Sequence, residues 1–486
     1  MKTTPMKHQL VGRERLAAMP DFFMLGCEQG TGKTWMLLDD AERQFSARRI
    51  DALLVVAPKG VHTNWILREI PTHMSIRTAC SYYLSGGGVR RAQEIERLFR
   101  LRDDRVLRVL SINTDALTTK DGFSLADRFL RTFRTMMVVD ESQRIKNINS
   151  LRTRRALLLG QHAVSRRIAS GTPITNSPLD IFAQMEFLSP RGNLLGTTSY
   201  RAFVAEYAEL LPPQHRLVQQ IRSANARGNP QIVARDAHGN PLWRNLEKLQ
   251  RLLAPYMYRV LKSECLDLPE KIYQTRYFTL APAQRVVYSR MKEQLQYARE
   301  NGEVDAFTAL ASIAKLRQIT SGFVLVDGVP QRLPPEQNPR MQLLREIIED
   351  IDGQFIVWAM FNEELEQIMA MLAELQIPAA RYCGKTTTKD RELAVDGFQA
   401  GHFRAFVGQP HSGGVGLTLT AATTAIYYSI DFNLGTRLQS EDRCHRIGTI
   451  KHVVYIDLSA IDTIDERMAA ALQAKEDVVF AILDAA

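Results

Sequence analysis

Short runs of β-branched and other apolar residues recur along the chain, and each is followed by a polar loop and a stretch with helical character. Continuous apolar runs of this length are typical of parallel strands buried on both faces, and their alternation with helices indicates βαβ units. The runs fall into two groups, at about 1–200 and about 335–486. They are Leu53–Ala57, Val106–Ile112, Met136–Val139, Gln354–Trp358, Phe403–Val407, Thr424–Tyr428 and Val453–Leu458.

The stretch between the two groups has a different pattern. Helical segments are expected around Tyr200–Leu210, Leu246–Leu253 and Ala283–Arg299, and the Gly-Asn steps within 226–243 favour a small hairpin. The sequence therefore predicts an α/β chain with two lobes, each a parallel sheet flanked by helices. The first lobe spans 1–200, a helical insertion and linker spans 201–334, and the second lobe spans 335–486.

The cysteine content and the hydropathy exclude several classes of protein. The five cysteines include no Cys-x-x-Cys pair, which argues against a disulfide framework or a zinc site. The N-terminus has no apolar signal region. The sequence contains no run of about 18 apolar residues, so no membrane span is predicted. We expect a monomeric cytoplasmic protein without membrane contact, or a nuclear one in a eukaryote. A net charge of +9 suits a polyanionic partner without identifying it.

A phosphate-binding loop is predicted at 25–35, in the run LGCEQGTGKTW. Glycines let backbone N–H groups turn toward phosphates, a lysine pairs with the β and γ oxygens, and a threonine hydroxyl ligates Mg²⁺. Cys27 stands where the first glycine is usual, so the alternative is a chance turn. The helical stretch that follows favours the loop. Its predicted ligands are Gly30, Thr31, Gly32, Lys33 and Thr34, with Thr34 also on the metal.

An apolar run that ends in two carboxylates is the second chemical feature. Asp140 is expected to hold Mg²⁺, and Glu141 to polarise the attacking water. The alternative is a solvated acidic strand end. The phosphate loop about a hundred residues upstream favours the catalytic interpretation.

With these pieces in order, the chain resembles the Swi/Snf family of ATP-dependent DNA translocases in helicase superfamily two, from Gln9 to about Glu466. The resemblance rests on VVAPKGVHTNW, VLSINTDAL, VVDESQRIKN, SGTPITNSPLDIFAQMEFLSP, LLAPYMYRVLKSECLDLPEK, GGVGLTLTAATT and QSEDRCHRIG. It implies two RecA-like lobes that use ATP and Mg²⁺ on double-stranded or forked DNA. We expect a bare motor without accessory domains, which favours a prokaryotic or viral source.

The resemblance also implies roles for single residues. Gln9 would bind adenine, and Gly414 and Gly416 would approach the nucleotide. Arg443 and Arg446 would act on the γ-phosphate, and their spacing predicts that one helical face presents both. DNA-backbone contacts are implied for Pro58, Lys59, Asn64, Trp65, Ser111 and Asn113. Coupling of the site to movement is implied for Gln143, Ser170, Gly171, Thr172 and Gln439.

Two differences from the family pattern concern the acidic box and the second lobe. Ser142 and Gln143 replace alanine and histidine, and Gln143 keeps the capacity to donate and accept hydrogen bonds toward the loop at Ser170. Phe432 stands where tryptophan is usual.

Arginines cluster in two groups that are candidates for phosphate contacts. The first is Arg90, Arg91, Arg97, Arg100, Arg102, Arg105 and Arg108, and intervening acidic residues favour a solvated helix face there. The second is Arg152, Arg154, Arg155, Arg166 and Arg167, which we predict as the better DNA candidate.

The expected function is an ATP hydrolase that moves along double-stranded DNA without sequence preference. A strand-separating helicase uses the same motifs, and the segment 221–245 is the candidate for its wedge. A DNA-binding scaffold with a vestigial ATPase is the third alternative. It is disfavoured by the presence of Lys33, Asp140, Glu141 and Arg446.

Overall fold

The computed structural model describes residues 1–190, 194–216, 218–219, 231–237, 239–300, 306–411 and 417–483. The side chains of 298–300, 306–310 and 388 are outside this description. The chain divides into two compact units. The first comprises Met1–Leu266 with Ala474–Ala486, and the second comprises Asp267–Gln473.

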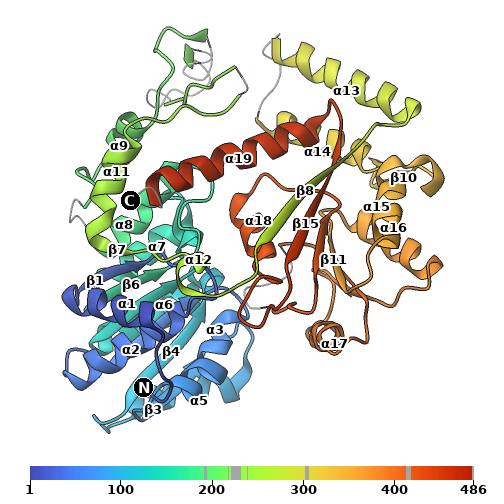
Figure 1. Ribbon diagram of the computed structural model, residues 1–486. Coiled ribbons are helices and arrows are strands. Elements are labelled where there is room, and N and C mark those ends of the chain that lie inside the picture. The colour runs from blue at the N-terminus through green and yellow to red at the C-terminus, as the bar shows by residue number, and fades with distance from the viewer. Residues whose placement is uncertain are drawn as a thin grey trace. The chain divides into compact units, whose positions relative to one another are not determined.

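The first unit is built on a seven-stranded sheet in which every described strand pair is parallel (Figure 1). Its strand order is β3-β4-β2-β5-β6-β1-β7. The strands are β1 Phe22–Leu25, β2 Ala52–Ala57, β3 Thr78–Tyr82, β4 Leu107–Asn113, β5 Thr135–Asp140, β6 Ser165–Ala169 and β7 Met257–Tyr258.

Helices cover both faces of this sheet. Successive side chains of a strand point to opposite faces, so they pack into different layers. On β2, Leu53 and Val55 pack with Leu16 of α1 and Met36 of α2, whereas the intervening Leu54 is buried on the opposite face. The helices are α1 Lys7–Ala18, α2 Lys33–Ser46, α3 Val61–Asn64, α4 Ile70–His73, α5 Gly88–Arg100, α6 Lys120–Thr132, α7 Leu151–Gly160, α8 Phe182–Leu188, α9 Tyr200–Tyr207, α11 Leu246–Leu253 and α12 Lys262–Cys265. A π-helical turn, η1 Trp65–Glu69, joins α3 to α4.

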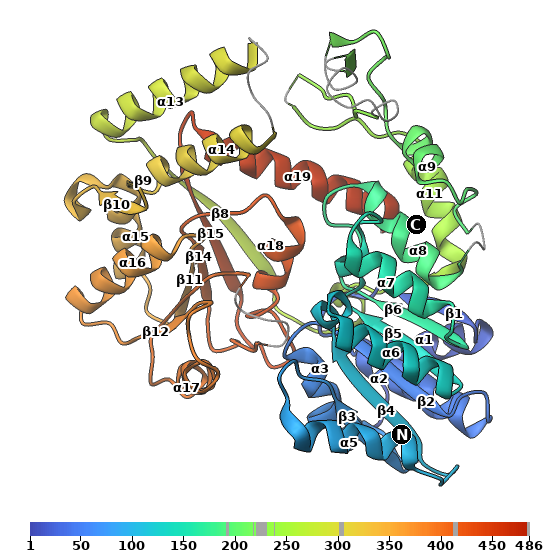
Figure 2. The ribbon, with the colours of Figure 1, turned by 180° about the vertical axis from the view of Figure 1, so that it is seen from behind.

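The second unit contains a six-stranded sheet, again with parallel pairs throughout its described strands, in the order β12-β13-β11-β14-β15-β8 (Figure 2). The strands are β8 Lys271–Phe278, β11 Phe355–Trp358, β12 Ala379–Tyr382, β13 Ala405–Gly408, β14 Thr424–Tyr427 and β15 Val453–Ala460. An antiparallel ribbon pairs β9 Phe323–Val326 with β10 Val329–Arg332. The helices are α13 Pro282–Glu300, α14 Ala306–Thr320, α15 Pro339–Glu349, α16 Asn362–Glu374, α17 Thr388–Gln399 and α18 Leu434–Glu441. The last helix, α19 Ile464–Leu483, begins in the second unit, and its residues from Ala474 belong to the first.

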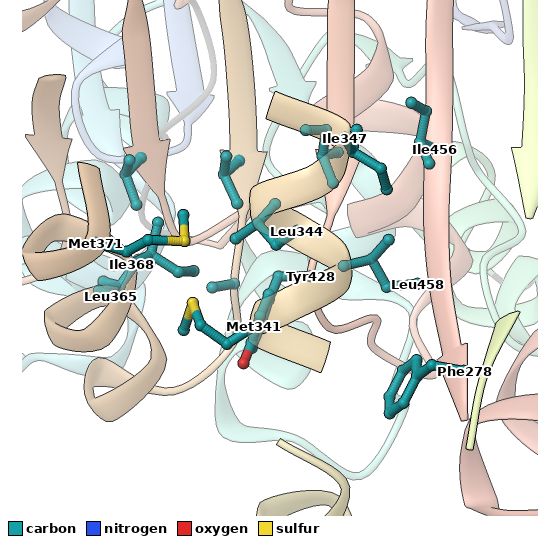
Figure 3. Packing of buried hydrophobic residues seen from close by; sticks show 14 of the residues in the cluster. Phe278, Met341, Leu344, Ile347, Leu365, Ile368, Met371, Tyr428, Ile456 and Leu458 are labelled. Carbon is teal, nitrogen blue, oxygen red and sulfur yellow. The ribbon is translucent and has the colours of Figure 1, made fainter. Parts of the chain in front are cut away.

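The core of the second unit also has two layers. Phe355 and Val357 of β11 pack toward α15 and α16, and the alternate Ile356 and Trp358 pack with Phe398 of α17. Figure 3 shows how α15 and α16 contribute residues three positions apart to the first layer. These residues are Met341, Leu344 and Ile347 on α15, and Leu365, Ile368 and Met371 on α16.

The predicted fold class is confirmed, since two parallel sheets flanked by helices are present. Each of the seven predicted strands overlaps an observed strand, and the three predicted helices correspond to α9, α11 and α13. The bridge between Arg235 and Pro241 closes a small antiparallel turn at the second of the two Gly-Asn steps, and the first step lies outside the described residues. The stretch 201–334 contributes to both units, because α9 and α11 belong to the first and α13 and α14 to the second.

All five cysteines are unpaired thiols. Among the described residues, no helix combines the length and the apolar character needed to cross a bilayer, and no group of three or more His, Cys, Asp or Glu side chains has the arrangement of a metal site.

Candidate nucleotide site and nucleic-acid interface

The phosphate loop connects the end of β1 to the start of α2 at Lys33. Gly30 and Gly32 have φ angles of +83° and +81°, a region that side chains rarely adopt. A Cβ atom on Gly32 would lie 2.0 Å from Nε2 of Gln9. Glycine is therefore required at position 32 both for the backbone turn and for the approach of Gln9.

The side chain of Lys33 folds back into this loop. Its ammonium donates hydrogen bonds to the carbonyl oxygens of Cys27 (2.9 Å) and Glu28 (3.0 Å). The hydroxyl of Thr31 donates to the same Glu28 carbonyl at 2.8 Å. Thr34 lies in the first turn of α2, where backbone N–H groups and the helix dipole favour an anion. The predicted ligands of the loop are thus gathered around one helix N-terminus.

Gln9 is buried beside the loop at the start of α1. Its Oε1 accepts a hydrogen bond from the backbone of Met6 at 2.8 Å, and its Nε2 lies 3.5 Å from the Thr31 carbonyl. The neighbouring His8 contacts that carbonyl through Nε2 at 2.7 Å. The structure therefore places Gln9 against the phosphate loop, and its adenine contact stays a prediction.

The two carboxylates of the acidic box have different surroundings. Asp140 ends β5 and accepts hydrogen bonds from the Trp65 indole N–H (3.0 Å) and from the Glu141 backbone (3.0 Å). Glu141 is 3% exposed, and its φ of 53° lies in the left-handed region. Burial and the adjacent Glu141 charge raise the pKa of Asp140 to about 6, while Lys33 acts in the opposite direction. Lys33 and Asp140 therefore belong to one electrostatic site.

The donor set fits Mg²⁺. A hard cation prefers oxygen ligands, and Thr34 and Asp140 supply a hydroxyl and a carboxylate. Desolvation makes the ionised form of Asp140 costly in the protein alone, as its raised pKa shows. A bound cation would favour that ionised form.

Gln143 connects the acidic box to the loop after β6. Its amide Nε2 donates to Oε2 of Glu141 at 2.7 Å, and its Oε1 accepts from the Ser170 hydroxyl at 2.7 Å. The Ser170 hydroxyl in turn accepts from the Thr172 backbone at 3.0 Å. Gln143 thus keeps the linking contacts that were expected of the residue at this position.

Gln29 and Arg259 also connect these loops, and no motif in the sequence indicated a role for either residue. Nε2 of Gln29 donates to Oε1 of Glu141 at 3.3 Å. Arg259, directly after β7, donates to the carbonyl oxygens of Gly26 (2.7 Å) and Gly171 (3.1 Å). Arg259 lies in the segment 252–271, which resembles the family, but only the fold brings this segment beside β1.

The residues predicted to contact DNA divide into exposed and buried ones. Lys59 is exposed and precedes Gly60, whose φ is +90°. Asn113 uses its Oδ1 to accept a hydrogen bond from the Ala116 backbone at 2.8 Å. The side chains of Ser111 (0% exposed) and Trp65 (1%) are enclosed by the core. The sheet and the π-helical turn direct these two side chains inward, and the DNA contacts of their segments stay predictions.

The members of the second arginine group differ in exposure, and the prediction of a DNA contact is wrong for Arg167. Arg167 is fully buried and pairs with Asp40 at 2.9 Å. Arg166 donates to the Leu188 carbonyl, Arg155 to the Leu117 carbonyl, and Arg152 pairs with Asp115. Arg154 is exposed on α7.

The first arginine group agrees with a solvated helix face along α5. Arg90 lies 3.4 Å from Glu94, and Arg91 pairs with the same carboxylate while its guanidinium covers the Tyr82 ring. Arg108 is an exception, since it is buried on β4 and donates to the Leu101 carbonyl at 2.8 Å.

In the second unit, the two arginines of the last motif lie in a turn-rich segment after α18. The helix ends at Glu441, so the prediction that one helical face presents Arg443 and Arg446 is wrong. Beyond the helix, backbone carbonyls have other partners: the Thr449 hydroxyl donates to the Cys444 carbonyl, and the Leu419 backbone donates to the Arg443 carbonyl.

Each of these motif residues has a defined environment. Arg443 is buried, Gln439 is half-buried on α18, and Arg446 donates to the Leu417 carbonyl (2.9 Å) and the Thr418 hydroxyl (3.2 Å). The predicted nucleotide contacts Gly414 and Gly416 lie outside the described residues.

A buried ion network holds the end of α18. Glu441 accepts hydrogen bonds from Lys271 (3.0 Å), Tyr273 (2.7 Å) and Arg437 (2.6 Å). Burial alone would raise the pKa of Glu441, but the charges of Lys271 and Arg437 outweigh it and lower the pKa. The helix that carries Gln439 is thereby fixed to the edge strand β8.

Comparison with known proteins places this geometry in a family. The model described as "SNF2-related domain" matches residues 21–322, and that described as "Helicase conserved C-terminal domain" matches 339–448. An uncharacterized ATP-dependent helicase of Mycoplasma genitalium is 24% identical over 97% of this chain and 42% of its own length. Chromodomain-helicase-DNA-binding protein 1-like of Danio rerio is 25% identical over 95% and 43%.

The chain spans a little under half the length of these relatives. The solved structure of a Sulfolobus solfataricus SWI2/SNF2 ATPase core in complex with dsDNA is similar over 100% of this chain and 98% of its own, with 21% identity and a TM-score of 0.41. Since the SNF2-related model alone covers more than half of the residues, the chain belongs to the Swi/Snf family of helicase superfamily two, with RecA-like lobes.

Proposed function

We propose that the chain is an ATP-driven translocase that moves along double-stranded DNA without sequence preference. The observation that supports it most is the continuous set of contacts in the first unit. Gln29 of the phosphate loop, Glu141 of the acidic box, Gln143 and Ser170 are joined in series by hydrogen bonds of 3.3, 2.7 and 2.7 Å. These contacts connect the phosphate loop and the acidic box to the loop after β6, which belongs to neither motif.

The chemistry follows from the residues of this site. Lys33 and the N-terminus of α2 would bind the phosphates, and Thr34 and Asp140 would hold Mg²⁺, which supplies positive charge to the phosphate oxygens. Glu141 would orient the attacking water and accept its proton at a carboxylate oxygen. Its two amide contacts restrict the carboxylate to one orientation. Arg446 is proposed to stabilise the charge that develops on the transferred phosphoryl group.

Contacts to DNA are proposed for the loop between β2 and α3. Lys59 is exposed there and carries a cationic ammonium group. Such groups bind phosphate oxygens rather than base edges, so the expected sequence preference is low. The names of the relatives include the words helicase and DNA-binding, which agrees with a nucleic-acid partner.

Movement along a duplex is tested by displacement of a third strand. A triplex-forming oligonucleotide bound ahead of the protein should be released in the presence of ATP, and Glu141→Gln should abolish the release. Release without hydrolysis, or no release from a duplex that does stimulate hydrolysis, would contradict translocation.

Strand separation is the second candidate, since relatives carry the name ATP-dependent helicase. The bridge between Arg235 and Pro241 closes a small turn in the segment predicted as its wedge. Displacement of one strand of a forked duplex, lost after deletion of 231–243, would favour the helicase over the translocase.

A further inference from the structure

Gln29 lies in the phosphate loop directly before Gly30. Its amide Nε2 donates to Oε1 of Glu141 at 3.3 Å, and Gln143 donates to the other oxygen, Oε2, at 2.7 Å. One carboxylate therefore receives amide N–H groups from two different loops. Because Glu141 is 3% exposed, little water competes for these positions.

The backbone of Glu141 explains why such support is needed. Its φ and ψ angles of 53° and 57° are left-handed, a conformation that costs a non-glycine residue on the order of 1 kcal/mol or more. The side chain starts from a strained backbone and has three rotatable bonds. Contacts on both oxygens fix the plane of the carboxylate, which a single contact would leave free to turn.

Gln29 also touches the loop that follows β6. A Cβ atom on Gly171 would lie 3.0 Å from the backbone nitrogen of Gln29 and 3.1 Å from its Cγ, so the two loops are in close contact. The adjacent Ser170 donates to Gln143. Both amide donors of Glu141 are thus braced by the same short segment, at Ser170 and Gly171.

We propose that Gln29 is a positioning residue, which together with Gln143 holds the carboxylate of Glu141 in the orientation needed for proton transfer from water. The inference rests on the proposed ATP hydrolysis, and it adds a residue that acts through Glu141 rather than on the nucleotide. Because Gln29 belongs to the phosphate loop, it links the position of that loop to the orientation of Glu141.

The test uses Gln29→Met in the full chain. Methionine keeps an unbranched side chain of similar length against Gly171 and removes the amide N–H. Turnover at saturating ATP with duplex DNA should fall about 10-fold or more, as expected for the loss of a hydrogen bond to a charged group. The affinity for a fluorescent ATP analogue and the thermal unfolding midpoint should stay within about twofold and about 2 °C of the parent.

Action through Glu141 is tested by placing Gln29→Met in the Glu141→Gln background. There it should produce no further fall in the single-turnover rate, because effects of residues that act as one unit are not additive. An equal fall in both backgrounds, weaker analogue binding with unchanged turnover, or unchanged kinetics would each overturn the proposal for Gln29 alone. A parent chain without any ATP hydrolysis would overturn the proposed function and this inference together.

Discussion

The indole N–H of Trp65 donates a hydrogen bond to Oδ2 of Asp140 across 3.0 Å. Trp65 begins a π-helical turn between α3 and α4, and such turns recur at functional sites. The exposed Lys59 lies six residues upstream, at the other end of the same short segment. The segment proposed to meet DNA therefore also orients the carboxylate proposed to hold Mg²⁺.

Trp65→Phe should raise the Mg²⁺ concentration needed for half-maximal ATP hydrolysis by about 10-fold. The ring still fills the core, but the contact that orients Asp140 is lost, and such supporting contacts typically contribute 10- to 100-fold to metal affinity or activity. A Mg²⁺ titration of the ATPase rate measures it.

Trp35→Phe is the matched control for this change. Trp35 is also buried, and its indole donates at 3.0 Å to the Thr3 hydroxyl rather than to the site. The Mg²⁺ requirement should be that of the parent. Equal shifts in the two variants would show that the effect is a general loss of stability.

Arg167→Met should lower the free energy of unfolding by about 3 kcal/mol, because it leaves the buried Asp40 without its principal partner. Arg154→Met, on the exposed face of α7, should change it by less than about 0.5 kcal/mol. Urea denaturation measures both. If Arg167→Met were as stable as the parent but bound duplex DNA more weakly, the structural role would be wrong.

Arg446→Ala should leave ATP binding nearly unchanged and reduce turnover by about 10³, as expected for a residue that contacts the transition state. Arg446→Lys should recover little, because an ammonium cannot reproduce the guanidinium fork. Equilibrium binding of an ATP analogue and steady-state kinetics separate the two effects. A fall in affinity with an unchanged maximal rate would make Arg446 a binding residue only.

Much of this fold was predictable, and the misses have definite causes. The seven predicted strands are continuous apolar runs, and such runs have few alternatives to a buried parallel strand. Strand β6 was missed because Arg166 and Arg167 break its apolar pattern, and only the distant Asp40 explains a buried guanidinium there. Strand β12 was missed because it is short and carries Arg381.

For the site, local motifs located Lys33, Asp140 and Glu141, since these chemical groups are required at fixed points of a phosphate loop and an acidic strand end. The direction in which each side chain points was harder to predict from the sequence. Trp65 belongs to a segment that suggested a surface role, and the π-helical turn directs it inward to Asp140. Arg259 reaches the phosphate loop only because β7 joins the edge of the sheet beside β1.

The central claim is tested most directly by the rate of ATP hydrolysis with duplex DNA, single-stranded DNA and RNA at matched nucleotide concentrations. Duplex DNA of any sequence should stimulate the rate well above its basal value. The apparent affinity should fall on the order of 10³-fold between 50 and 200 mM salt for about six phosphate contacts. Lys59→Ala should weaken the affinity equally on all sequences. Stimulation by RNA alone, or by single strands alone with unwinding of forks, would contradict a double-stranded DNA translocase.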